Sequence, residues 1–234
     1  MEDVGGLDHL AELVRVQDAF LASIDEVDPD TRVPWCGRWR VRDVVVHLGR
    51  IHHWAAAQAR RTREVPLGRG PFDLAPFYAE HAHELRTALV ELGPDAIGST
   101  LLGPGPASFW RRRQLHETLV HLWDVRTAGG LPTSAPAPVW ADTVDEVVTV
   151  MQPRQVRMGR MPPLEVTVRL VADDADLTWD MAGETGRSPD VTVTSSAERL
   201  ALMLWKRVPT GDGSLVVAGD AHVLAQVIGQ RITP

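Results

Sequence analysis

The chain has 234 residues, a formal charge of −7, 44% hydrophobic residues and 24% charged residues, the ordinary composition of a globular protein with one large or two modest domains. The acidic balance provides no overall positive field for nucleic acid or an anionic membrane, so neither is expected as a partner. Met1 is followed by acidic residues, and no run of about 18 apolar residues occurs, which predicts a cytoplasmic protein without a membrane span.

The first half of the chain is predicted to be a helical bundle. Apolar residues recur at helical spacing in four segments: 7–27, 41–63, a segment ending near residue 91, and 108–128. Glycine- and proline-rich stretches separate them, including residues 66–71 and 103–106. The segment 33–39 contains two tryptophans and is expected to be an ordered loop held by aromatic burial.

After a proline-containing linker at residues 131–138, the pattern changes to that of an α+β domain. We therefore expect two domains, residues 1–133 and 134–234, and a multidomain fold of the α and α+β classes. The second domain has a helical stretch at 140–151, a turn at 183–186, and alternating segments typical of strands at 165–170, 177–181, 191–194 and 215–217. Ser195 with Glu198, and later Asp220, are expected to cap two further helices.

A candidate metal site begins with Glu117 and His121. Four residues turn a helix through about 400°, so both side chains lie on one face. Such a pair is often only a solvated ion pair, and a third ligand is needed. His47, on the apolar face of the second predicted helix, is the best candidate, and Asp43, one turn before it, could accept its second ring N–H or simply stabilise the first turn. With Cys36 as the sole cysteine, any metal must use histidine and carboxylate.

Helical geometry directs the neighbouring histidines away from this set. His116 precedes Glu117 but points about 100° away from it, which makes it a poor ligand for the same ion. Cys36 has no recognisable partner base and is expected to be a structural thiol. Four other histidines are expected to be solvated: His52, His53, His81 and His83.

Two histidines and one carboxylate leave coordination positions open for water or substrate, as in catalytic zinc sites. Zn²⁺ is the expected metal, although nickel, iron and manganese accept the same ligands. Arg113, one turn before Glu117, could orient that carboxylate or receive an anionic substrate, or could form an ordinary ion pair.

Two motifs in this order resemble the mycothiol-dependent maleylpyruvate isomerase family of the DinB-like superfamily. They are Trp35-x3-Trp39-x-Val41-x-Asp43-x3-His47 and Arg113-x2-His116-Glu117-x3-His121-x-Trp123-Asp124. The second half also resembles the C-terminal domain of that family, in Leu202-x-Leu204-Trp205-x-Arg207 and Val217-x-Gly219-Asp220-Ala221.

The resemblance implies a DinB-like four-helix bundle that holds a divalent metal through His47, Glu117 and His121, followed by a smaller α+β domain similar to sterol carrier proteins. It also implies mycothiol, the low-molecular-weight thiol of actinobacteria, as cosubstrate. Arg207 is a candidate for closing over the site, while Trp205 is expected in the core. The sequence does not indicate an oligomeric state.

The implied function is that of an isomerase or S-transferase in which a metal-activated thiol adds to a small electrophile. Two alternatives stay open at this point. One is a non-catalytic protein that binds a metal or a small molecule, and the other is a hydrolase that uses metal-activated water. The identity of the electrophile does not follow from the resemblance.

Overall fold

The computed structural model describes residues 6–181 and 188–234 and divides the chain into two compact units. One is residues 8–134, and the other is residues 135–234 together with residues 6–7. The turn expected at 183–186 lies outside the described residues. Within the described ranges, no helix has both the length and the apolar character needed to cross a membrane.

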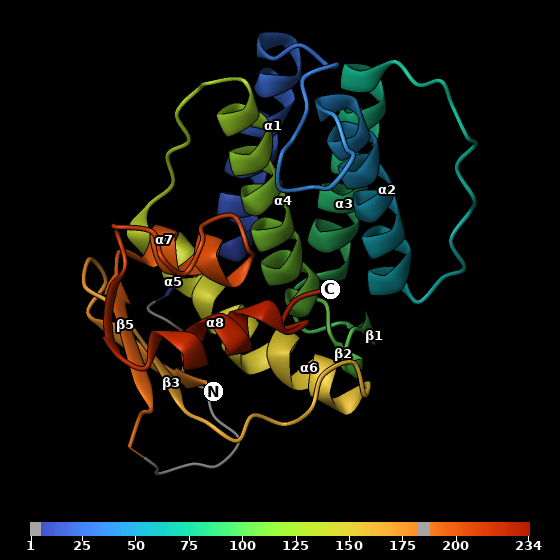
Figure 1. The fold of residues 1–234 in the computed structure, drawn as a ribbon. Coiled ribbons are helices and arrows are strands. Elements are labelled where there is room, and N and C mark those ends of the chain that lie inside the picture. Colours follow the sequence, from blue (N-terminus) through green and yellow to red (C-terminus); the bar gives the residue numbers. More distant parts are fainter. Residues whose placement is uncertain (1–5, 182–187) are drawn as a thin grey trace. The chain divides into compact units, whose positions relative to one another are not determined.

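The first unit contains four long helices that lie alongside one another (Figure 1). They are α1 (His9–Glu26), α2 (Val41–Arg60), α3 (Leu74–Leu92) and α4 (Ser108–Ala128), close to the predicted ranges. The glycine- and proline-rich stretch before α4 was expected only to break the chain. It also forms an antiparallel hairpin of β1 (Ile97–Thr100) and β2 (Gly103–Pro106).

The helices α2 and α3 pack side by side and run in the same direction. His53 bonds to Glu84 at 2.7 Å, and Arg60 bonds to Glu91 at 2.9 Å, so the contacting positions advance together along both helices. The connection 61–73 must therefore return along the length of the bundle, as Figure 1 shows. This extended connection carries the predicted glycine- and proline-rich segment.

Helix α4 is covered on two opposite faces, as its sequence requires. The apolar stripe of Leu115, Leu119 and Leu122 is at most 3% exposed, and on the other face Arg113 and His121 are 4% and 8% exposed. The charged face of α4 therefore lies in a protein interior, where electrostatic interactions are stronger than in water.

The second unit combines helices with a mixed four-stranded sheet. Its helices are α5 (Ala137–Glu146), the π-helical segment η1 (Val147–Met151), α6 (Gln152–Arg157), α7 (Ala197–Leu204) and α8 (Ala221–Gly229). The sheet has the order β4-β3-β5-β6, in which β3 pairs parallel with β5 and the other pairs are antiparallel. The strands are β3 (Val168–Ala172), β4 (Leu177–Met181), β5 (Val191–Ser195) and β6 (Val216–Gly219).

Two capping predictions for this unit have different outcomes. Asp220 caps α8 as expected, since its side chain accepts a hydrogen bond from the backbone N–H of His222. The expected cap of α7 is wrong by one residue, because Ser196 and not Ser195 accepts from the backbone of that helix. Ser195 ends β5, and its hydroxyl donates to the carbonyl of Ser214 at 2.7 Å.

Candidate metal centre

The side chains of His47, Glu117 and His121 meet between α2 and α4. One ligand atom from each lies within 4.8 Å of the other two. Glu117 Oε1 is 3.1 Å from His47 Nε2 and 3.5 Å from His121 Nε2. The sequence predicted that Glu117 and His121 share one helix face, and the packing of α2 on α4 brings His47 to that face.

Arg113 holds Glu117 as a carboxylate. Its guanidinium donates to Glu117 Oε2 from one helical turn earlier, and the two side chains are only 5% and 15% exposed. Burial alone would raise the pKa of Glu117, but Arg113 and hydrogen bonds from His121 and His47 hold that pKa well below its usual range. The carboxylate therefore stays charged in an interior site, where it can bind a cation.

Asp124 orients the His121 ring through the nitrogen that points away from Glu117. Its carboxylate is fully buried and accepts a hydrogen bond from His121 Nδ1 at 2.9 Å. The Cys36 thiol also donates to this carboxylate, at 3.5 Å. Burial by itself would lower the pKa of His121, whereas hydrogen bonds to Asp124, Cys36 and Glu117 raise it well above its usual value.

The resulting hydrogen-bond pattern fits a cation. With Nδ1–H committed to Asp124, a neutral His121 ring presents a lone pair at Nε2 toward Glu117 Oε1. Two acceptors then face each other, and either a proton or a metal ion must lie between them. Metal-bound histidines commonly donate their other ring N–H to a carboxylate, as His121 does here.

Asp43 has a structural role at the start of α2, and its role toward His47 stays a prediction. The Asp43 carboxylate accepts a hydrogen bond from the backbone N–H of Arg40 at 2.8 Å and thereby caps the start of α2, which was the alternative role. The Trp39 ring lies next to His47, with centroids 5.0 Å apart. The loop 33–39 is thus tied to the site through an aromatic side chain.

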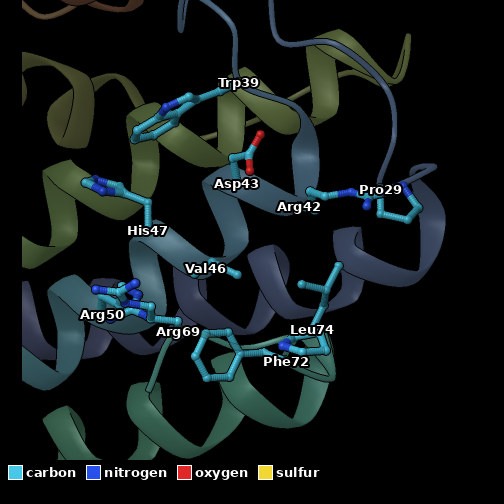
Figure 2. Close-up of a pocket in the computed structure, with 11 residues that line it drawn as sticks. Pro29, Trp39, Arg42, Asp43, Val46, His47, Arg50, Arg69, Phe72 and Leu74 are labelled. Carbon is cyan, nitrogen blue, oxygen red and sulfur yellow. The ribbon is translucent and has the colours of Figure 1, made fainter. Parts of the chain in front are cut away.

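A cavity of about 590 Å³ opens beside His47, a size typical of small-molecule sites. Figure 2 shows that its walls come from the start of α2 and from the returning connection to α3. Arg42 is paired with Asp30, and Arg50 binds the carbonyls of Leu67 and Gly68. The polar and aromatic lining residues include Trp39, Arg42, Asp43, His47, Arg50, Arg69 and Phe72.

His52 was expected at the surface, and this is wrong because it is fully buried in the bundle. Its two ring nitrogens contact Gln17 Nε2 at 3.2 Å and Gln114 Oε1 at 2.9 Å. His52 is covered by side chains of α1, α3 and α4, namely Gln17, Tyr78 and Gln114, which the sequence of α2 alone does not reveal. Burial lowers the pKa of His52 to about 4.

The low pKa of His52 predicts acid sensitivity. Because the unfolded chain binds this proton near pH 6.5 and the folded chain near pH 4, stability is fully present above about pH 6.5 and falls as the pH drops toward 4. The full effect is about 3 kcal/mol. Urea unfolding of metal-free protein should show wild type losing about 2–3 kcal/mol more than His52→Gln between pH 7.5 and 4.5. Parallel pH profiles for the two proteins would contradict this assignment.

Two other histidines expected in solvent are also buried: His53 is 9% exposed and His81 is 5% exposed. They face each other between α2 and α3, with ring centroids 5.2 Å apart. His83 is exposed as predicted. His116 is buried on a different side of α4, with its ring 6.5 Å from that of His9 in α1.

Arg207 lies in the second unit, where its guanidinium donates to the backbone carbonyl of Trp205 at 2.7 Å. Its role toward a thiol stays a prediction. Trp205 is 8% exposed, in keeping with the expected core position.

Asp124 is the site residue to which the sequence reasoning assigned no role. The signal was present, because Asp124 follows His121 by three residues and therefore shares its helix face. The spacing does not reveal that Asp124 is buried, and burial is what distinguishes it from a solvated carboxylate.

Comparison with known proteins agrees with this architecture. Two solved structures, the mycothiol-dependent maleylpyruvate isomerase and a histidine-to-alanine mutant of it, are similar over 93% of this chain and 96% of theirs. Their TM-scores are 0.65 and 0.68 at 14% and 13% sequence identity, which shows a shared fold. No curated protein sequence matches the chain.

A family model provides the assignment. Residues 10–126, half of the chain, match the model described as the mycothiol maleylpyruvate isomerase N-terminal domain. This match spans α1 to α4 and all the residues of the candidate centre. The chain therefore belongs to the mycothiol maleylpyruvate isomerase N-terminal domain family.

Proposed function

We propose that the protein is a metal- and mycothiol-dependent isomerase or S-transferase, with His47, Glu117 and His121 as ligands of a divalent metal, Zn²⁺ in the first instance. The observation that carries the proposal is the meeting of these three side chains within 4.8 Å beside a cavity that His47 lines. The family's name and the solved relatives, which are mycothiol-dependent, support the choice of thiol.

A bound divalent ion would lower the pKa of a thiol or water at its open coordination positions. The chain's own residues prepare this chemistry. Arg113 keeps Glu117 charged, and Asp124 fixes the tautomer of His121 so that its Nε2 lone pair faces the site. The Trp39 ring packs against one side of the His47 ring and helps to hold it in place.

The cavity favours a small anionic electrophile. Three arginines line it, and only one carboxylate, Asp43, lines it with them. Among the described residues, Arg69 has no side-chain partner, so its guanidinium is available to an incoming carboxylate. The thiolate sulfur would add to the β-carbon of an α,β-unsaturated acid and break the C=C π bond, whose electron pair moves into the conjugated carbonyl. Rotation about the resulting single bond, followed by return of that pair and expulsion of the thiolate, gives the isomer, and protonation of the α-carbon gives the S-conjugate.

The proposed thiol dependence is tested by assaying a panel of α,β-unsaturated acids with the Zn²⁺-loaded protein, with and without mycothiol. We expect turnover only with the thiol, and at least about 100-fold slower turnover for His47→Ala, since metal-site groups contribute to rate on this scale. Equal product formation without thiol would support the metal-dependent hydrolase instead. Metal binding without turnover of any substrate would support the non-catalytic alternative.

We further propose that the predicted domains 1–133 and 134–234 have different roles in binding. The first would hold the metal, and the second, in which we propose a fold similar to sterol carrier proteins, would contribute Arg207 to thiol binding. The mixed sheet and the amphipathic helices of residues 135–234 support this assignment.

A further inference from the structure

A second cluster of metal-ligating side chains lies between α2 and α3. It consists of His53 from α2 with His81 and Glu84 from α3, and one ligand atom of each lies within 4.8 Å of the others. His53 follows His47 by six positions on α2, which corresponds to about 9 Å along the helix and a different face. The cluster is therefore separate from the centre built on Glu117.

The hydrogen bonds of His53 determine which of its nitrogens can bind a cation. His53 Nε2 lies 2.8 Å from the backbone carbonyl oxygen of Val65. A carbonyl oxygen only accepts hydrogen bonds, so Nε2 carries the proton and a neutral ring has its lone pair at Nδ1. This Nδ1 points at Glu84 Oε2, only 2.7 Å away.

His81 converges on the same oxygen. Its Nδ1 lies 3.2 Å from Glu84 Oε2, one helical turn along α3. A carboxylate oxygen and a ring nitrogen with a lone pair are both acceptors, so the contact with His53 needs a proton or a metal ion between them.

We propose that His53, His81 and Glu84 form a second binding site for a divalent transition-metal ion, of which Zn²⁺ is the representative. Two imidazoles and one carboxylate favour such an ion over Mg²⁺ or Ca²⁺, which prefer oxygen ligands. The bond from His53 to Val65 is the outer contact that metal-bound histidines commonly make to a backbone carbonyl. Glu84 is 35% exposed, which provides a route from solvent.

The position of the cluster suggests what the ion does. Its ligands come from two neighbouring helices that run in the same direction, and Val65 belongs to the long connection between them. An ion at this point links α2, α3 and the returning connection 61–73. The same connection supplies Arg69 to the wall of the cavity beside His47. The second site would therefore stabilise the cavity wall without touching a substrate.

The test separates this site from the proposed catalytic one. Zn²⁺ is titrated by calorimetry into chelator-treated His47→Ala/His121→Ala protein, whose remaining uptake reports the second site. We expect about one equivalent and a higher melting temperature with Zn²⁺. Adding His81→Ala or Glu84→Gln should weaken Zn²⁺ binding at least about 100-fold. Loss of an outer-sphere contact weakens metal binding by up to about 100-fold, and loss of a direct ligand should cost no less.

His83→Ala in the same background is the matched control, because His83 lies on α3 but is exposed, and it should leave Zn²⁺ binding unchanged. Circular dichroism checks that each variant is folded. If His81→Ala does not fold, Glu84→Gln provides the test of the second site. The proposal is overturned if the background protein takes up no Zn²⁺, or if uptake persists through both substitutions. These outcomes leave the centre at His47 untested and unaffected.

Discussion

His47→Ala and His121→Ala are each expected to purify with one equivalent of metal fewer than wild type. Each substitution leaves two ligands, and the open cavity beside His47 replaces the lost nitrogen only with water. We expect Zn²⁺ affinity at this centre to fall by at least about 100-fold. Inductively coupled plasma mass spectrometry gives the stoichiometry, and competition with a chromogenic chelator gives the affinity.

A graded series strengthens this test. Asp124→Asn keeps the three ligands but weakens the acceptor behind His121, so affinity should fall by about 10–100-fold. His222→Ala removes an exposed imidazole of the second unit and should change nothing. Undiminished metal in both His47→Ala and His121→Ala would end the three-ligand proposal.

The second large effect is expected from Arg113→Leu. It leaves the Glu117 carboxylate buried without its guanidinium partner, and breaking a buried pair in this way costs about 3–5 kcal/mol. Urea unfolding of metal-free protein measures the loss. Arg113→Lys should recover only part of it, since a lysine ammonium does not reproduce the planar guanidinium.

The double variant Arg113→Leu/Glu117→Leu identifies the cause. If the unpaired carboxylate is responsible, removing it restores most of the stability, because apolar replacement of a whole buried pair is often neutral. The double variant would also lose the metal of this centre. If the single and double variants are equally unstable, the loss reflects packing of the Arg113 side chain and not its charge.

Both predictions depend on the unusual burial of α4. A helix with leucines on one face and Arg113, Glu117 and His121 on the other would place its charged face in water if only one side were covered. Here α2 covers the charged face, and the cost of desolvation is offset by pairs that extend from Arg113 through Glu117 to His121 and Asp124. The same contacts give the centre its charge and its orientation.

The sequence by itself determined what depends on neighbours in the chain. Helical periodicity located α4 at residues 108–128, and the i,i+4 spacing placed Glu117 and His121 on one face. The acceptor side chain of Asp220 indicated the start of α8. These features follow from the rise and turn of one helix or from a single local hydrogen bond, so they can be read along the chain.

Only the tertiary structure decided which faces meet. His52 and His53 looked solvated because they point away from the face of His47, and His81 because it diverges from His83 on the same helix. The parallel packing of α2 and α3 instead buries all three. The direction of α3 depends on the path of the connection 61–73, which helical spacing cannot specify. The approach of His47 to Glu117 and the burial of Asp124 arise in the same way, because burial is a property of the partner surface and not of the segment itself.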